Sequence, residues 1–220
     1  QLVTNTAAHP FKNFKDYYFA NPQITEFNRR TTLEDQNLND RGELEITAEN
    51  FWQSAKTPMQ LKVYASLLDS GGRPVSRAVS NYALPADQLV GIRPLFADDS
   101  APYDSNANFE IILTDGERKL AAQNLSVKLV REQRNYHWFY NSSSGWMSDY
   151  TERHYSVSEQ QVAVKADGFA SVSLPVEWGH YRLEVTNADN QLVTGYKFRA
   201  GWSADETVMS GRPDRIGLAL

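Results

Sequence analysis

The side chains that could bind a metal ion are scattered along this chain rather than grouped. None of the histidines lies near another histidine, or near a glutamate at a spacing typical of zinc sites. Isolated histidines on loops and strand faces are more common than metal ligands. We therefore expect no metal centre at these four positions: His9, His137, His154 and His180.

Acidic and amide side chains in residues 98–108 could supply oxygen ligands for calcium. A helix–loop–helix calcium site needs acids at alternate positions, a central glycine and a terminal glutamate. This stretch has a different order. We interpret it as a solvated loop between domains, which contains Asp98, Asp99, Asp104, Asn106 and Asn108.

Residue types for nucleophilic catalysis are missing or lack their context. The chain has no cysteine, which excludes thiolate metal sites and cysteine nucleophiles. It has no Gly-x-Ser-x-Gly elbow and no glycine loop for a phosphate. Carboxylates are numerous, but nothing in the sequence places two of them across a cleft. We predict a protein that is not an enzyme and uses no cofactor.

The segment 134–150 has the clearest potential for binding. Two aromatic arms flank an Asn/Ser/Gly turn, a pattern that predicts a projecting hairpin. Aromatic rings can stack on sugars or anchor a protein partner. The candidate contact residues are Tyr136, Trp138, Tyr140, Trp146 and Tyr150.

The alternative for this hairpin is that its aromatic side chains pack over the open end of the domain or against a neighbouring domain. We favour packing, because aromatic residues are common in strands. If they pack, replacing Trp138 and Trp146 with alanine lowers stability. If they form a binding surface, the same changes abolish ligand binding and leave the melting temperature unchanged.

The elements that must position these residues are strands. Tyr181, Leu183 and Val185 alternate with Arg182 and Glu184, which is typical of a half-buried strand. No segment combines helical periodicity with helix caps. Similar patterns predict strands at 1–6, 43–47, 60–68, 73–83, 92–97, 108–113, 125–132, 157–165, 169–174, 181–185 and 192–200.

Three further features lie between these strands. Residues 9–22 form an aromatic loop with room for a short helix, and residues 26–39 form a polar excursion over the surface. We expect Trp178 to be buried at a bend that Gly179 allows.

The same order of strands and turns occurs twice. Gly42 recurs as Gly168, 126 positions later, with strand, loop, strand, turn and strand following each. A repeat of this length indicates two tandem copies of one domain. We predict an all-β chain of two antiparallel β-sandwich domains, residues 1–88 and 89–210, with residues 211–220 as the first strand of a following domain. At the same offset Gln1 corresponds to Val127, in the third strand of the second copy, so we expect the first copy to lack its N-terminal strands and the chain to be an excerpt of a longer array.

Composition narrows the classes of partner. The net charge of −5 argues against a nucleic-acid-binding protein, which normally carries a basic surface. No apolar run is long enough to cross a membrane, so we expect this segment to make no direct membrane contact.

Several short motifs follow one another in a fixed order along nearly the whole chain. They lie at residues 66–75, 84–87, 91–94, 127–132, 175–179, 181–185 and 212–215. In order and spacing they resemble the fifth and sixth macroglobulin-like domains of the bacterial alpha-2-macroglobulins, relatives of the animal protease traps.

The resemblance implies a non-catalytic scaffold in a protein that traps proteases in the periplasm and is anchored to a membrane by a lipid. Its partners would be neighbouring macroglobulin-like domains, and proteases through other parts of the protein. The family's thioester needs a cysteine, which is absent here, and its bait segment would lie beyond Leu220, so no functional residue is carried over. A scaffold that transmits bait cleavage predicts a packed, rigid junction at residues 84–92.

Two other functions remain open. One is a carbohydrate-binding or adhesive surface domain that uses the hairpin 134–150. The other is an accessory β-domain of an extracellular hydrolase.

Overall fold

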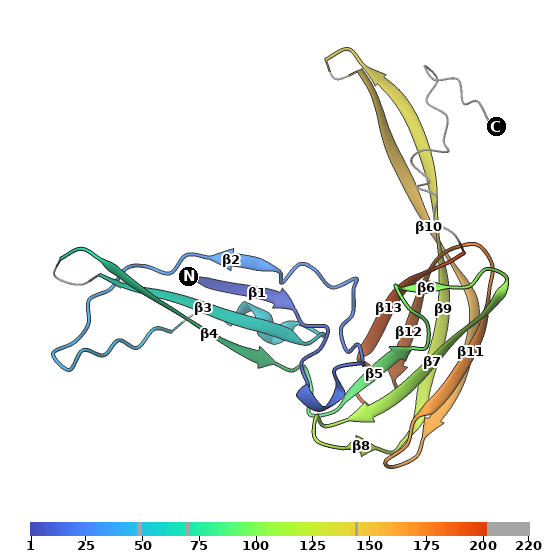
Figure 1. Cartoon of the computed structure of the whole chain (residues 1–220), viewed down its shortest axis with the longest axis horizontal. Helices are drawn as coiled ribbons and strands as arrows, with labels where there is room; N and C mark the ends of the chain where they lie inside the picture. The colour runs from blue at the N-terminus through green and yellow to red at the C-terminus, as the bar shows by residue number, and fades with distance from the viewer. Residues whose placement is uncertain (48–49, 69–70, 144, 202–220) are drawn as a thin grey trace.

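The computed structural model describes residues 1–47, 50–68, 71–143 and 145–201, with the backbone alone for residues 134–136. The described chain is built from three β-sheets (Figure 1). One sheet lies in the N-terminal part and two form a sandwich in the C-terminal part. The predicted first strand of a following domain, residues 211–220, lies outside the described residues.

The N-terminal sheet has the strand order β2-β1-β3-β4. Its strands are β1 (Leu2–Thr6), β2 (Arg29–Thr31), β3 (Met59–Leu68) and β4 (Pro74–Ala83). All neighbours are antiparallel, and β3 and β4 pair residue by residue from Met59 opposite Ala83 to Leu68 opposite Pro74. Two short 3-10 helices flank the strands, η1 (Lys12–Phe14) and η2 (Phe51–Ser54).

The C-terminal sandwich packs a sheet of order β10-β9-β12-β13-β6 against a sheet of order β11-β7-β5, with β8 beside β7. Only β13 and β6 are parallel among the described pairs. The bounds are β5 (Leu89–Pro94), β6 (Ser100–Ala101), β7 (Ser105–Thr114), β8 (Lys119–Leu120), β9 (Ala122–Asn141), β10 (Gly145–Val164), β11 (Ala170–Val176), β12 (Gly179–Asn187) and β13 (Val193–Ala200).

The core of the sandwich follows the alternation of its strands. In β12, Tyr181, Leu183 and Val185 are each at most 2% exposed, and they face the core side chains of β7 and β11. Aromatic rings fill one end, where Phe109 packs edge-on against Phe198 at 5.3 Å between ring centres and against Phe96 at the same distance. Burial of such side chains is the main driving force for the fold.

The two units share a strand order, which supports the internal repeat. The sheet β2-β1-β3-β4 has the same sequence of antiparallel neighbours as β10-β9-β12-β13. The all-β antiparallel fold class is therefore confirmed. Most predicted strands are present, with β5 starting three residues earlier, at Leu89.

The polar excursion at 26–39 is mostly exposed, as expected, and contains the short strand β2. Three other expectations from the sequence are wrong. Residues 43–47 form no strand. Trp178 is 44% exposed, because it lies over Gly201 at the surface. Residues 98–108 do not link domains, since they run through β6 and into β7 inside the sandwich.

The hairpin is longer than expected. β9 and β10 each have 20 residues; they include the predicted strand 125–132, all but the last residue of the predicted strand 157–165, and the aromatic arms. Among the described residues, no helix is long and apolar enough to span a membrane.

Candidate functional site

A segment of the N-terminal unit, between β1 and β2, lies at its junction with the sandwich. We call residues 9–23 the docking segment. Its Tyr18 N–H donates to the carbonyl of Ile92 at 2.7 Å, and the Ile92 N–H donates back to Tyr18 at 2.9 Å. Gly195 N–H donates to the carbonyl of Ala20 at 3.0 Å. The segment therefore bonds to β5 in one sheet of the sandwich and to β13 in the other.

Backbone hydrogen bonds also hold the docking segment and the residues just before it to the rest of the N-terminal unit. Phe19 N–H donates to Ala8 at 2.9 Å, and Ala7 N–H donates to Pro58, next to β3, at 2.8 Å. One short stretch of chain is thus bonded to both units, which restricts their relative movement.

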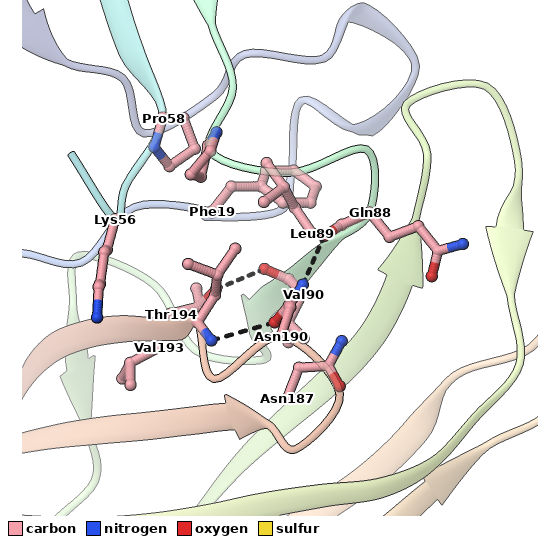
Figure 2. Close-up of a pocket in the computed structure, with 12 residues that line it drawn as sticks. Phe19, Lys56, Pro58, Gln88, Leu89, Val90, Asn187, Asn190, Val193 and Thr194 are labelled. Carbon is pink, nitrogen blue, oxygen red and sulfur yellow. Dashed lines mark hydrogen bonds between the residues drawn. The ribbon is translucent and has the colours of Figure 1, made fainter. Parts of the chain in front are cut away.

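Phe19 is the apolar anchor of the junction. It is 1% exposed and forms a second core cluster with Tyr17, Leu89 and Ile112. Full burial of a side chain of this kind contributes about 2–3 kcal/mol. Figure 2 shows Phe19 beside Leu89, in a crevice lined from the N-terminal unit by Pro58 and from the sandwich by Thr194, among others.

Gly91 allows this contact. A Cβ atom at this position would lie 2.7 Å from Phe19 Cε1 and 3.1 Å from Ile112 Cγ1, which is closer than carbon atoms pack. Next to it, Thr194 Oγ1 donates to the carbonyl of Val90 at 2.8 Å and joins β13 to β5 (Figure 2). The packing predicted for the 84–92 junction is present at residues 89–92, which are buried, whereas Leu84 is 41% exposed. The rigidity of the junction stays a prediction.

A network of charged and polar side chains holds Tyr17 of the docking segment in place. The Tyr17 hydroxyl donates to Glu110 Oε2 at 3.0 Å, and Arg93 donates to the same oxygen. The Arg93 guanidinium also lies 5.4 Å from the centre of the Tyr17 ring. Burial, together with the hydrogen bond to Glu110, raises the pKa of Tyr17 from 10 to about 12.

This shift predicts how docking depends on pH. Because the folded-state pKa of Tyr17 lies above that of the unfolded chain, its contribution to stability is fully present below pH 10 and is lost as pH rises through about 12. We expect Tyr17→Phe to remove this part of the alkaline loss. Urea unfolding at pH 8 and pH 11 measures it, with the exposed Tyr103 replaced by phenylalanine as control. Equal alkaline losses in wild type and Tyr17→Phe would contradict the assignment.

The end of the docking segment covers charged residues of β12. Arg182 donates to Glu132 and, through Nε, to Glu184 Oε1 at 2.8 Å. The Gln23 amide, oriented to satisfy both partners, donates to Glu184 at 3.2 Å and accepts from Arg182 at 3.1 Å. Arg182 and Glu132 side chains are only 5% and 4% exposed, so this ion pair is shielded from solvent.

The Glu132 carboxylate of that pair also lies close to a second carboxylate and an imidazole. Atoms of Glu132, Glu152 and His154 lie within 4.8 Å of one another, a spacing that a metal ion could bridge. The Glu132 carboxylate, however, already accepts from Arg182 and lies 3.7 Å from the Lys197 ammonium. These cations neutralise it, so we assign the group to the ion-pair network.

Of the other histidines and acids considered from the sequence, His180 is the register partner of Glu132 in the sheet, whereas His9, His137 and Asp99 lie elsewhere. His9 Nδ1 lies 2.8 Å from the carbonyl of Tyr17 and helps to shape the docking segment. His137 contacts Thr151 on the hairpin. Asp99 accepts from the Tyr196 hydroxyl. That hydrogen bond and, above all, burial raise the pKa of Tyr196.

The five aromatic candidates lie on the projecting part of β9 and β10. Trp146 is paired with Tyr140, and Tyr150 with Tyr136. Tyr140 is 65% exposed, and Trp138 and Trp146 are half-buried. The side chain of Tyr136 lies outside the described residues. Packing over the open end of the sandwich is therefore wrong for the described aromatic side chains, because the hairpin extends away from it (Figure 1).

Comparison with known proteins assigns a family to this arrangement. Residues 91–202 match the model described as bacterial macroglobulin domain 6, and residues 1–85 match the bacterial alpha-2-macroglobulin MG5 domain. The chain belongs to the bacterial alpha-2-macroglobulins. The family resemblance deduced from the sequence motifs is confirmed.

Curated relatives of this alpha-2-macroglobulin segment are much longer than the chain. The alpha-2-macroglobulin of Escherichia coli K12 is 41% identical over 202 residues, which cover 83% of this chain and 12% of the relative. That of Xylella fastidiosa 9a5c is 42% identical over 170 residues, covering 74% of this chain and 10% of the relative. The chain thus spans about an eighth or less of their length.

Solved structures of alpha-2-macroglobulins contain the same pair of units. The native conformation of the E. coli protein matches with a TM-score of 0.89 and 33% identity, over 98% of this chain and 14% of that one. The E. coli protein activated by porcine elastase matches with a TM-score of 0.84 and 36% identity, over 93% and 18%. The Salmonella protein reacted with methylamine gives 0.86 and 36%, over 92% and 14%.

Sequence reasoning missed the docking segment as a site. Its aromatic residues were assigned to a loop, although the density of Phe and Tyr between 11 and 19 was a signal of burial. The predicted short helix there is confirmed as η1.

Proposed function

We propose that the two units act as a non-catalytic scaffold in a protease-trapping alpha-2-macroglobulin. The docking segment carries this proposal. It bonds to both sheets of the sandwich and to the N-terminal unit, so cleavage elsewhere in the protein can move the pair as one body. The matches to native and elastase-activated relatives span nearly the whole pair with TM-scores of 0.89 and 0.84, which supports a similar placement of the units in both states.

The cellular setting forms part of the same proposal. We place the parent protein in the periplasm, held to a membrane by a lipid anchor outside this chain, as the family resemblance implies. Proteases would be bound by other parts of the parent. The acidic net charge of −5 supports a role without nucleic acid.

The test is protease capture by the longer polypeptide that contains this segment. Phe19→Ala removes the anchor of the junction, while Tyr103→Ala changes an exposed aromatic ring as the matched control. After exposure to elastase, we expect the Phe19 variant to be cleaved normally but to shield the protease from a large protein substrate several-fold less well. A small peptide substrate reports the total active protease.

The result must be separated from simple unfolding. Circular dichroism and limited proteolysis establish that each variant is folded before capture is measured. Full capture by a folded Phe19→Ala variant would overturn the scaffold role of the junction. Hydrolysis of peptides by the purified 220-residue chain would contradict its non-catalytic assignment.

The carbohydrate-binding or adhesive alternative depends on a different observation, the exposure of Tyr140 and Tyr150 on the hairpin. Binding of the purified chain to a glycan array, lost in Trp138→Ala with Trp146→Ala, would favour it.

A further inference from the structure

Among the residues that the structure describes, no further strand pairs with the outer part of the long hairpin. β9 pairs with β12 only from Leu125 to Glu132, whereas β9 and β10 pair with each other out to Asn141 opposite Gly145. Figure 1 shows this two-stranded ribbon clear of the sandwich. An isolated two-stranded ribbon is only marginally stable in water, so this one gains stability from any surface that covers it.

One face of the ribbon tip carries large aromatic rings. Residues that alternate along a strand share a face, and cross-strand pairing brings Tyr140 opposite Trp146. Their rings pack edge-on with centres 5.7 Å apart. Trp138, two residues before Tyr140, lies on this face opposite the small Ser148.

The opposite face of the tip is also apolar. Phe139 pairs with Met147, and their residues are 45% and 40% exposed. His137 lies on this face and its Nε2 is 2.9 Å from the hydroxyl of Thr151. Apolar groups on both sides of one ribbon fit a cleft with two walls. A platform for a flat sugar ring needs one aromatic face only.

The tip is free of formal charge. From Asn135 to Ser148 the sequence contains no Asp, Glu, Lys or Arg. Its Trp, Tyr, Asn, Ser and Gly composition is that of surfaces that bind proteins through aromatic anchors and adaptable hydrogen bonds. A partner for this tip must therefore be apolar and uncharged rather than acidic or basic.

A permanent partner fits better than an occasional one. Exposed apolar surface promotes aggregation. A tip whose partner was a protease would be exposed to solvent whenever no protease was bound, which is most of the time. The rest of the polypeptide could supply a permanent partner, because in the native E. coli relative 86% of the chain lies outside the matched region.

We propose that the hairpin tip, residues 137–143 and 145–148, inserts into an uncharged apolar cleft formed by other domains of the same polypeptide. The inference rests on the scaffold function proposed above and adds a second attachment, far from the docking segment. The tip then works as a clamp, with Trp138, Tyr140 and Trp146 against one wall and Phe139 and Met147 against the other.

Hydrogen exchange measured by mass spectrometry tests the clamp. Backbone amides of the tip are compared in the 220-residue chain and in the longer polypeptide. We expect exchange at the tip to be at least about tenfold slower in the longer polypeptide, because the cleft suppresses local opening. Equal exchange rates in the two samples would overturn the proposal.

Two paired variants of the longer polypeptide test each wall separately. One carries Trp138→Ser with Trp146→Ser, and the other carries Phe139→Ser with Met147→Ser; Tyr103→Ser is the control for loss of an exposed aromatic ring. We expect both pairs to remove the extra protection and the control to keep it. Loss of protection from the tryptophan pair alone would exclude the two-walled cleft.

Other occupants give different results, and each would overturn the proposal. A glycan partner would protect the tip of the 220-residue chain when a neutral oligosaccharide such as chitotetraose is added. A second copy would make the sedimentation of this chain depend on concentration through the same residues. Protease capture, measured in parallel, separates the hypotheses: capture with an unprotected tip removes the clamp and leaves the scaffold function intact.

Discussion

Replacing Gly91 with valine should open the junction between the two units. The Cβ atom alone would lie 2.7 Å from Phe19 Cε1 and 3.1 Å from Ile112 Cγ1, and valine adds two methyl groups. Phe19 and Ile112 are at most 1% exposed, so neither the ring nor the isoleucine side chain has space to move. Overpacking of this kind costs about 3 kcal/mol at its upper end. Calorimetric unfolding of the chain measures the loss.

A double-mutant cycle provides the control for Gly91. Phe19→Leu shortens the side chain that the new Cβ atom would meet. Gly91→Ala should therefore cost less in the Phe19→Leu background than in wild type, by an interaction energy of about 1 kcal/mol or more. Strictly additive costs would mean that Phe19 is not the group that Gly91 accommodates.

Replacing Glu132 with glutamine should destabilise the sandwich nearly as strongly. The change keeps the shape of the side chain but removes the charge that Arg182 faces, and both side chains are at most 5% exposed. A buried charge left without its partner costs about 3–5 kcal/mol. We expect about 3 kcal/mol, since Glu184 still accepts from Arg182 at 2.8 Å. Urea unfolding followed by circular dichroism gives the value.

The matched control is an ion pair of the same chemistry at the surface. Arg131 donates to Glu177 at 3.1 Å, and the Glu177 side chain is 77% exposed. Exposed pairs contribute at most about 1 kcal/mol, so Glu177→Gln should change the free energy of unfolding by less than that. Similar costs for Glu132→Gln and Glu177→Gln would show that burial does not decide the strength of the inner pair.

Local patterns were sufficient to predict the strands and their faces. The alternation of Tyr181, Leu183 and Val185 with Arg182 and Glu184 assigned the core face of β12, because side chains in a strand point to opposite sides in turn. It also assigned Arg182 to the outer face. Its burial there could not be predicted, because the chain that covers it comes from residues about 160 positions earlier, near Gln23.

The strand expected at 43–47 shows a second limit of local patterns. In the repeat this segment corresponds to β11, which forms by pairing with β7. The described residues of the N-terminal unit contain no sheet partner for it. Leu44 and Ile46 consequently stay about 40% exposed. A strand needs a neighbour to bond to, and alternation within the segment carries no information about that neighbour.

The functional surfaces were predictable to different degrees. The turn residues and aromatic arms were enough to predict the hairpin, since both are local signals. Its length and direction depend on the pairing of β9 with β12 ending at Glu132, which is a property of the whole sheet. For the docking segment, aromatic composition indicated burial but not the surface that would bury it.

Tyr18 and Ala20 also bear on how this protein can be produced in parts. Their backbone groups form hydrogen bonds with Ile92 in β5 and Gly195 in β13. In a fragment that starts at Leu89, the backbone groups of Ile92 and Gly195 would lose these partners and be exposed to solvent. A strand edge with unpaired N–H and C=O groups can form hydrogen bonds with a strand of another molecule, which leads to aggregation. A fragment of the sandwich that is to remain monomeric at high concentration should therefore include residues 9–23, supplied in the same chain or as a separate peptide.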